Sequence, residues 1–254
     1  MSSDPFAQAT DALRAARRVV VLSGAGMSAE SGVPTFREAQ TGLWEEFDPS
    51  RLATPEAWEA DPPFVWAWYA WRVGLVSETE PNAGHHALAA LAQTHDVAII
   101  TQNVDDLHER AGSTVLAHIH GSLFEYRCGD CDVPYDGEVG VPAEPVERLA
   151  PHTCTHCQGD VRPGVVWFGE DLPLEDYRAS VETLESLTKG DVCLVVGTSG
   201  IVYPAAGMPA IARGSGATVI EINPHESDIS DMCDIVIRGS AATVLPQLVA
   251  AATD

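Results

Sequence analysis

Four cysteines in two closely spaced pairs carry the most specific chemical signal in the chain. Cys128 and Cys131 form one CxxC pair, Cys154 and Cys157 form the other, and residues 132–153 lie between them. Each pair can supply two corners of a thiolate tetrahedron around zinc, and four sulfur ligands leave no open position for a substrate. Two disulfides are the alternative, but disulfides are rare in cytoplasmic proteins, where paired CxxC motifs usually hold metal. The spacing predicts one structural Zn²⁺ per chain.

A glycine-rich turn follows the apolar run Val19–Ser23. It reads Gly24-Ala25-Gly26-Met27-Ser28-Ala29-Glu30-Ser31-Gly32. Glycines at such a turn let the backbone approach a phosphate at a helix N-terminus. The third glycine comes too late for the dehydrogenase fingerprint, so hydride transfer is not indicated. A tight turn without a ligand remains the alternative on these residues alone.

Polar side chains with acid–base or hydrogen-bonding capacity follow two other apolar runs. Asn103 and Asp105 come just after Val97–Thr101, and His120 comes just after Val115–Ile119. The carboxyl ends of strands in an open α/β sheet are where ligands bind. Imidazole suits a general base, because its ordinary pKa near 6.5 lets it accept a proton at neutral pH. The residues alone favour His120 no more than His118, and Asn103 and Asp105 could be ordinary loop residues.

The elements that must position these groups are short Val/Ile-rich strands separated by helices. Most of the runs are apolar throughout, as expected of a parallel sheet covered on both faces, and helical stretches such as His85–Gln93 and Tyr177–Leu187 lie between them. We therefore predict an α/β fold with a Rossmann-like, doubly wound parallel sheet. The predicted strands are Val19–Ser23, Val97–Thr101, Val192–Gly197, Thr218–Asn223 and Asp234–Ile237.

Two stretches interrupt this alternation of strands and helices. Residues 41–80 hold five of the six tryptophans and have a helical pattern, whereas residues 128–160 are rich in Cys, Pro and Gly. We expect a helical insert (41–80) and a zinc-ribbon insert (128–160) to form a smaller domain. Residues 1–40, 81–127 and 161–254 are expected to form the larger one. Cys193 and Cys233 are expected to be core residues.

Composition narrows the class of partner. The chain has 254 residues with 14 Lys+Arg against 37 Asp+Glu, a formal net charge of −23, and Lys189 is its only lysine. Binding to a phosphate backbone needs clustered basic side chains, so a nucleic-acid partner is not expected. No apolar run approaches the roughly 20 residues of a membrane span, and residues 1–10 lack the pattern of a signal peptide. We expect a cytoplasmic protein without a membrane partner.

Five further motifs, in order along the chain, resemble those of the sirtuins, the NAD-dependent protein lysine deacylases. They are Val33-Pro34-Thr35-Phe36-Arg37, Thr101-Gln102-Asn103-Val104-Asp105, His120-Gly121-Ser122, Gly197-Thr198-Ser199 and Glu221-Ile222-Asn223. The resemblance extends from about Val19 to Val244 and implies that NAD is consumed as a cosubstrate. It also implies a Rossmann-like large domain and a zinc-bearing small domain.

The resemblance implies a role for each matching residue. His120 is the implied general base, and Asn103, which holds a water or a ribose hydroxyl, shares the catalytic site. Gln102 and Asp105 line the nicotinamide and ribose pocket with Asn103, and Asp105 accepts from the carboxamide. Arg37 helps to place the ribose and phosphates, while Phe36 shields the reactive sugar carbon. The other implied NAD-binding residues are Gly24, Ala25, Gly26, Ala29, Gly197, Thr198, Ser199 and Asn223.

Tyr69 and Arg72 bear on which acyl group is removed. Three residues apart on a helix, they point to the same side. Sirtuins that remove succinyl or malonyl groups carry this Tyr-x-x-Arg pair, in which the guanidinium holds the acyl carboxylate. Thr35 is similarly typical of that branch. The alternative is an aromatic core helix with Arg72 reaching solvent, and Gly200, which could widen the wall of the site, departs from the usual pattern.

By the same resemblance, the substrate peptide pairs as an added strand with Val165, Val166 and Phe168, so little of its flanking sequence is read. We therefore expect a desuccinylase and demalonylase with some deacetylase activity, which releases nicotinamide and O-acyl-ADP-ribose from acylated-lysine proteins. A monomer is the favoured state. The alternatives are an NAD-dependent protein ADP-ribosyltransferase and a non-catalytic NAD-sensing module; a zinc-ribbon nucleic-acid binder is the weakest because of the charge.

Overall fold

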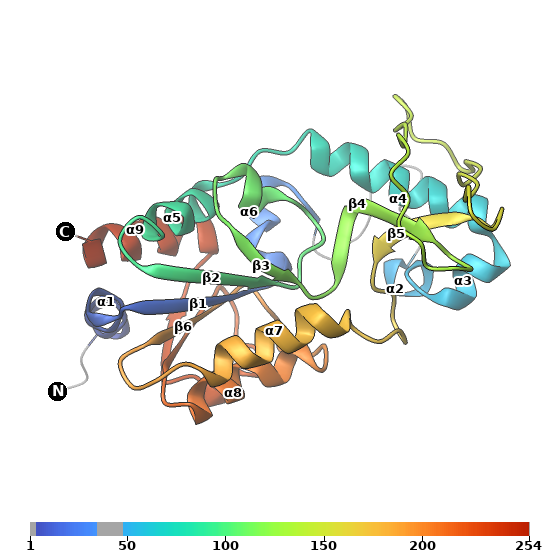
Figure 1. The fold of residues 1–254 in the computed structure, drawn as a ribbon. Coiled ribbons are helices and arrows are strands. Elements are labelled where there is room, and N and C mark those ends of the chain that lie inside the picture. The colour runs from blue at the N-terminus through green and yellow to red at the C-terminus, as the bar shows by residue number, and fades with distance from the viewer. Residues whose placement is uncertain (1–3, 35–47, 254) are drawn as a thin grey trace.

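Six strands lie parallel in one sheet of the computed structural model, which describes residues 4–34 and 48–253 (Figure 1). The chain leaves β1 towards β2 and β3 on one side and later continues through β6, β7 and β8 on the other. This is a doubly wound sheet, which confirms the predicted fold class. The order across the sheet is β3 (Val115–His118), β2 (Asp96–Thr101), β1 (Arg18–Ser23), β6 (Val192–Val196), β7 (Thr218–Asn223) and β8 (Ile235–Arg238).

Helices cover both faces of this sheet. Helices α1 (Pro5–Ala15), α5 (Ala83–Leu91) and α9 (Ala241–Thr253) pack on one face, while α7 (Leu174–Glu185) and α8 (Met208–Gly214) pack on the other. Along β1, Val19 and Val21 join the first core cluster, and Val20 and Leu22 join the second. Because alternate residues meet an apolar layer on either side, the strand sequences are apolar throughout rather than alternating.

The starts of three helices are encoded by adjacent residues. Asp4, Thr54 and Asp61 each accept a hydrogen bond from a backbone N–H of the first turn, and a proline follows each of them directly. A proline at the first helical position loses nothing, because its missing N–H would have had no partner within the helix. The side-chain cap then satisfies one of the remaining donors. Helices α1, α3 (Pro55–Ala60) and α4 (Pro62–Ser77) therefore begin at these residues.

A second, smaller layer of structure lies beside the carboxyl ends of the strands (Figure 1). Helices α2 (Pro49–Leu52), α3 and α4 pack with an antiparallel pair, β4 (Gly121–Cys128) and β5 (Val161–Val165). Their shared core contains Trp58, Trp66 and Trp68. Residues 48–80 are helical in large part, as the sequence predicted, whereas the β4–β5 pair was not predicted.

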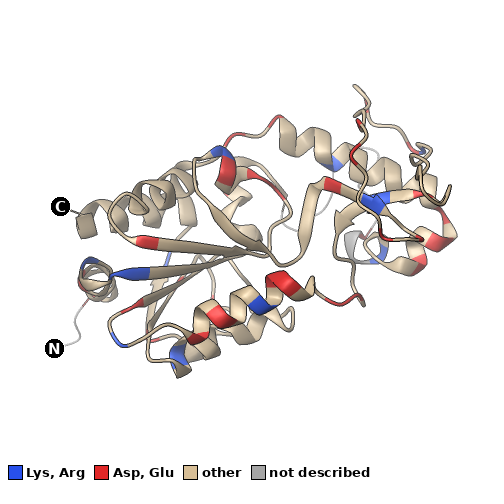
Figure 2. Cartoon of the chain, viewed as in Figure 1, with Lys and Arg blue, Asp and Glu red and all other residues tan. Residues whose placement is uncertain are grey.

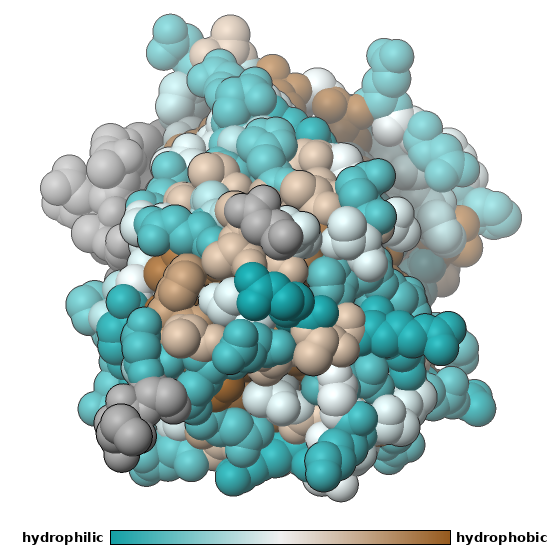
Figure 3. All heavy atoms as spheres, turned by 90° about the vertical axis from the view of Figure 1, so that its left-hand side faces the viewer, coloured by the Kyte–Doolittle hydropathy of each residue, from teal (hydrophilic) through white to brown (hydrophobic). Residues whose placement is uncertain are grey.

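Two helices carry several acidic residues (Figure 2), and the face shown in Figure 3 is mainly hydrophilic. Acidic residues recur along α7 and α3 (Figure 2). The face that carries α1 and α9 is covered mainly by hydrophilic side chains with scattered apolar ones (Figure 3). Within residues 4–34 and 48–253, no helix combines the length and the apolar character that crossing a membrane requires.

Candidate functional site

Glycines bring the end of β1 against the end of β6. The Gly24 N–H donates to the Val196 carbonyl at 2.9 Å, and the Gly26 N–H donates to the Gly197 carbonyl at 2.8 Å. A Cβ on Gly24 would lie 2.9 Å from Thr198, and one on Gly26 would lie 2.8 Å from the Gly197 Cα. Gly197 itself has φ +63°, a left-handed conformation that favours glycine. The strand order changes direction here, which in open α/β sheets is the place where ligands bind.

The turn that follows continues as two short 3₁₀ segments rather than as a long helix. Ala25 begins the first segment (Ala25–Met27), and Ala29 begins the second (Ala29–Ser31). Gly32 ends the second segment with φ +95°. The predicted Phe36 and Arg37, and also Thr35, lie outside the described residues.

Asn103 lies in a buried hydrogen-bond network beneath the glycine turn. Its Nδ2 donates to the Ser28 Oγ at 3.1 Å, and the His85 Nε2 lies 3.5 Å from the same oxygen. The Asn82 N–H donates to the His85 Nδ1 at 3.2 Å, which leaves the proton of a neutral ring on Nε2. Burial, followed by the effect of His86, lowers the pKa of His85 to about 4, so this ring is neutral at neutral pH.

Asp105 is buried next to this network. Burial raises the pKa of its carboxyl group, hydrogen bonds from Ser28 and from the Leu107 N–H lower it, and the net direction is upward. The Leu107 N–H lies 3.2 Å from the Asp105 Oδ1.

Gln102 connects the carboxyl end of β2 to the loop after β6, because its Nε2 donates to the Thr198 Oγ1 at 3.1 Å. The ends of β1, β2 and β6 are thus joined by polar side chains.

The structure distinguishes His120 from His118. The His120 Nδ1 lies 3.0 Å from the Gln102 carbonyl, which can only accept, so the neutral ring carries its proton on Nδ1 and has a basic Nε2. Burial lowers the pKa of His120, and the Gln102 hydrogen bond only partly opposes this. His118 is held at both nitrogens instead, with Nδ1 3.1 Å from the Asn103 carbonyl and Nε2 2.7 Å from the Glu109 carboxylate.

The same contacts set the charge of His118. Burial lowers its pKa, but the hydrogen bonds to Glu109 and to the Asn103 carbonyl, with the Glu109 charge, raise it above its ordinary value. Burial raises the Glu109 pKa, but the hydrogen bond to His118, a backbone hydrogen bond and the His118 charge together lower it below its ordinary value. His118 is therefore part of an ion pair, and of these two histidines only His120 has the protonation state of a base.

Sequence reasoning gave no role to His108, which lies behind this site. Its Nε2 is 2.9 Å from the Ser23 Oγ, and its ring stands edge-on to that of His85 with the centroids 5.0 Å apart. Burial, together with the neighbouring His85 and His118, lowers its pKa to about 3. No local pattern predicts these contacts, because 57 residues separate Ser28 from His85 and 23 separate His85 from His108.

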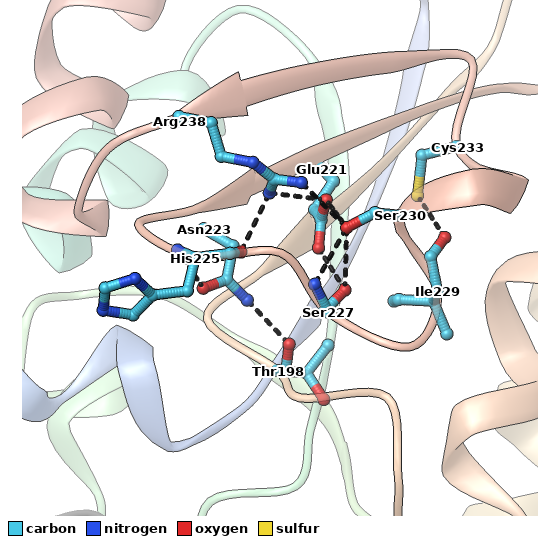
Figure 4. Close-up of polar contacts among 9 residues, drawn as sticks. All are labelled: Thr198, Glu221, Asn223, His225, Ser227, Ile229, Ser230, Cys233 and Arg238. Carbon is cyan, nitrogen blue, oxygen red and sulfur yellow. Dashed lines mark hydrogen bonds and ion pairs between the residues drawn. The ribbon is translucent and has the colours of Figure 1, made fainter.

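Asn223, the last residue of β7, lies against Thr198 in the loop that follows β6 (Figure 4). The Asn223 Nδ2 donates to the Thr198 carbonyl at 2.7 Å, and the Asp228 N–H donates to the Ser199 carbonyl at 3.1 Å. Gly200 has φ +71°, and a Cβ there would lie 2.7 Å from the Ile229 Cγ2. Ile229 thus occupies the space that a larger residue at position 200 would need, so Gly200 does not leave a widened wall.

Tyr69 and Arg72 share one side of α4, as the spacing predicted. The Tyr69 hydroxyl accepts from the Trp167 Nε1 at 3.0 Å, and burial raises its pKa to about 12. The Arg72 Cζ lies 5.9 Å from the centre of the Tyr69 ring and 5.0 Å from that of Trp68. Burial lowers the Arg72 pKa, while Tyr69 and Asp105 oppose this. Arg72 therefore lies half-buried on aromatic rings within electrostatic reach of Asp105.

The segment from Val165 to Glu170 runs beside His120. The Val166 N–H donates to the His120 carbonyl at 2.9 Å, and Val165 pairs with Gly121. Phe168 is 46% exposed. A bidentate contact between Arg162 and Glu170, at 2.5 and 2.9 Å, fixes the end of the segment, and the Glu170 Oε2 accepts from the Trp167 N–H. The three predicted peptide-contacting residues thus lie on one short, anchored segment next to the proposed base.

The four predicted cysteine ligands come together. Their sulfurs all lie within 4.8 Å of one another, with 3.3 Å between Cys128 and Cys157 and 3.8 Å between Cys131 and Cys154. A tetrahedron with Zn–S bonds of 2.3 Å has edges of about 3.8 Å, so this donor set fits Zn²⁺. Backbone N–H groups of Asp130, His156 and Gly159 point at three of the sulfurs, as expected around thiolates.

The two remaining cysteines lie elsewhere. Cys193 is fully buried in β6, whereas Cys233 is half-buried and donates from its thiol to the Ile229 carbonyl at 3.3 Å. Burial raises the pKa of both thiols, in Cys233 to about 12. The raised pKa values favour the neutral thiol at both positions.

Comparison with known proteins gives concordant matches. The model of the Sir2 family matches residues 24–204. An NAD-dependent protein deacylase of Mycolicibacterium paratuberculosis is 52% identical over 231 residues, which are 91% of this chain and 96% of that protein.

Solved structures agree with these sequence matches. A Sir2 homolog–NAD complex superposes with a TM-score of 0.88 at 41% identity, covering 97% of this chain and 93% of that one. A mutant Sir2 homologue in complex with 2'-O-acetyl ADP ribose has a TM-score of 0.87 at 41% identity, with 97% and 96% covered.

Proposed function

The chain belongs to the Sir2 family, and from this premise we propose that it is an NAD-dependent protein-lysine deacylase that removes succinyl and malonyl groups, and acetyl groups to a lesser extent. The name of the mycobacterial relative supports the deacylase activity. The bound NAD and 2'-O-acetyl ADP ribose in the two solved relatives support the cosubstrate and the product class. The products would be nicotinamide and O-acyl-ADP-ribose.

The crevice at the ends of β1, β2 and β6 would hold NAD, which when bound supplies the ribose carbon that receives the acyl oxygen as nicotinamide leaves. The glycine contacts bring the β1 and β6 turns close together, and a pyrophosphate would lie against the backbone at this end of the sheet. Gln102, Asn103 and Asp105 would face the nicotinamide end. Thr198, Ser199 and Asn223 would face the adenosine end. Phe36 and Arg37 keep the roles that the family resemblance implies.

His120 would take a proton from a ribose hydroxyl. Its Nδ1–H is held by the Gln102 carbonyl, so Nε2 is the basic atom, and burial keeps the ring neutral at the pH of the cytoplasm. Asn103 would hold a hydroxyl or a water beside it, because its own amide is fixed by Ser28. The base and its partner are thereby oriented before the substrate arrives.

The contact geometry of Tyr69 and Arg72 is the observation that carries the acyl preference. Trp167 donates to the Tyr69 oxygen, so the phenolic O–H is directed elsewhere, and a pKa of about 12 keeps that proton in place. Arg72 adds a guanidinium that stacks on Trp68 and remains charged. A phenol and a guanidinium on one side of a helix match the carboxylate of a succinyl or malonyl group, which an acetyl group lacks.

The substrate would be an acylated-lysine protein, bound as an extended strand. The exposed Phe168 and the position of Val165 and Val166 next to His120 support this segment as the one that meets the peptide. Main-chain pairing reads little of the flanking sequence. We propose that the enzyme acts as a monomer in the cytoplasm, and that Zn²⁺ held by the four cysteines stabilises the smaller layer without touching substrate.

The test is turnover of one peptide carrying acetyl-, malonyl- or succinyl-lysine, with and without NAD, by the wild type and by Arg72→Met. We expect succinyl removal to dominate in the wild type. Arg72→Met should erase that preference and spare acetyl removal, because methionine keeps most of the packing on Trp68 but removes the charge.

Other results would redirect the assignment. Dominant acetyl removal in both proteins would make Tyr69 and Arg72 core residues without a role in specificity. Transfer of label from NAD to protein with little acyl loss would indicate an ADP-ribosyltransferase. Binding of NAD without turnover on any peptide would indicate a sensor.

A further inference from the structure

A buried carboxylate lies behind the adenosine end of the site. Glu221 is in the middle of β7 and only 1% exposed. Its two oxygens accept from the hydroxyls of Ser227 and Ser230, the latter at 2.6 Å, and from the Arg238 Nη1 at 2.9 Å (Figure 4). A buried charge is retained when such donors satisfy it and is costly when one is removed. Glu221 is therefore a fixed anchor, although the family motif that contains it gave it no role.

Arg238 extends this anchor to the loop 224–230 between β7 and β8. Besides Glu221, its guanidinium donates to the His225 carbonyl at 2.9 Å and to the Ser230 Oγ at 2.9 Å. The Ser227 N–H also donates to the Ser230 Oγ at 2.9 Å. The loop is thus tied to the carboxylate and its arginine at three positions along its length.

The anchored loop in turn holds the loop after β6. The Asn223 Nδ2, next to the anchored loop, donates to the Thr198 carbonyl, and the backbone N–H of Asp228 donates to the Ser199 carbonyl. Ile229 packs into the space above Gly200. The residues that we assign to the adenosine end therefore take their positions from the loop that Glu221 fixes.

We propose that Glu221, with Arg238, Ser227 and Ser230, is a positioning unit for the adenosine half of NAD. This inference rests on the proposed function, because it assigns NAD to this crevice. The unit would set the affinity for the dinucleotide and leave the chemical step at His120 unchanged, since it touches the loops around Asn223 and Ser199 and none of the groups at the nicotinamide end.

Glu221→Gln is the variant of choice, because it keeps the shape of the side chain but replaces one acceptor oxygen by an NH₂ donor. The amide keeps one acceptor for Ser230 and Arg238 but removes the negative charge that pairs with Arg238, so the anchor of the loop is weakened. The matched control is Asp191→Asn. Asp191 is also buried, and its carboxylate accepts two hydrogen bonds of 2.9 Å from Thr188. It lies just before β6, at the amino ends of the strands and away from the proposed NAD site.

The measurements are ADP-ribose affinity by calorimetry, KM for NAD, kcat at saturating NAD, KM for the acyl peptide, and the melting temperature. For Glu221→Gln we expect ADP-ribose affinity to fall and KM for NAD to rise about tenfold, as for one lost charge-assisted contact, with kcat and peptide KM within about twofold. Asp191→Asn should lower the melting temperature while leaving both NAD readouts unchanged. Arg238→Lys should behave like Glu221→Gln, because the ammonium group of lysine cannot make the several hydrogen bonds of the planar guanidinium.

Two outcomes would overturn the proposal. One is unchanged ADP-ribose affinity in Glu221→Gln; the other is an equal loss of kcat, KM and stability in both carboxylate variants. If Glu221→Gln does not fold, Ser227→Ala removes one donor from a half-buried position and must raise KM for NAD. A wild type that binds neither ADP-ribose nor NAD would instead refute the proposed function.

Discussion

Replacing Tyr69 by Phe removes one oxygen that has two tasks in the proposed site. The oxygen accepts from the Trp167 Nε1 at 3.0 Å, in a place where Tyr69 is 3% and Trp167 2% exposed. The indole N–H would be left buried without this acceptor, at a cost of about 2 kcal/mol. For a protein of this size we expect the melting temperature to fall by about 4–8 °C.

The second task of the Tyr69 oxygen is donation to the acyl carboxylate. A hydrogen bond to a charged group contributes about 1.5–3 kcal/mol, so Tyr69→Phe should lower kcat/KM for a succinyl peptide roughly 10- to 100-fold. An acetyl group has no carboxylate to lose, and kcat/KM for the acetyl peptide should stay within about threefold. The assay is steady-state kinetics with the two peptides at the same sequence and pH.

Tyr126→Phe is the control, because its ring packs on Trp66 in the same core while its hydroxyl does not bond to Trp167. It should change neither the acyl preference nor the Trp167 environment. Equal losses for acetyl and succinyl peptides in Tyr69→Phe would show that the phenol only supports the fold. A melting temperature equal to that of the wild type would refute the buried hydrogen-bond argument.

Three further predictions concern acid–base chemistry and metal. His120→Ala should abolish deacylation with the fold intact. In the wild type, kcat/KM should be flat from pH 7 to 8 and fall only below the ordinary histidine pKa of about 6.5, because burial lowers the His120 pKa. A decrease of kcat/KM on acidification that begins above pH 7 would contradict this. The pKa values of His85 and His108 are lowered to about 4 and about 3, so below pH 6.5 each histidine binds fewer protons in the folded than in the unfolded state. The free energy of unfolding should therefore fall on acidification, by up to about 1.4 kcal/mol per pH unit for each histidine. When this free energy is measured by urea unfolding at several pH values, it should depend less steeply on pH in His108→Gln than in the wild type. Chelation of Zn²⁺ should shift tryptophan emission to longer wavelength, since Cys128 and Cys154 share a core with Trp58 and Trp66, and an unchanged spectrum would argue against a structural metal.

The central strands of the main sheet could be predicted because they are buried on both faces. The runs Val19–Ser23 and Thr218–Asn223 match β1 and β7 to within one residue, as burial of alternate side chains against two helical layers requires. The β4–β5 pair escaped prediction because β5 reads Val-Arg-Pro-Gly-Val and buries a charged side chain. Arg162 is accommodated there by Glu170 and by the Trp167 ring, both of which come later in the chain.

The choice between His118 and His120 shows the same limit at the site. His118 lies inside one apolar run and His120 directly follows it, and no local pattern separates them. Glu109 pairs with His118, and the Gln102 carbonyl holds only one nitrogen of His120. The difference in protonation therefore depends on partners that come from other parts of the chain.

Local order along the chain determined the two cysteine pairs, the glycine turn, the central parallel strands and the Tyr69–Arg72 spacing, because each depends on neighbours a few residues away or on a repeating burial pattern. The tertiary structure decided which groups act together. Asn103 meets Ser28 across 75 residues, and Tyr69 meets Trp167 across 98. Hydrogen bonding and burial act through space, so the pKa values and the anchor at Glu221 depend on contacts that exist only once the strand ends and loops have converged.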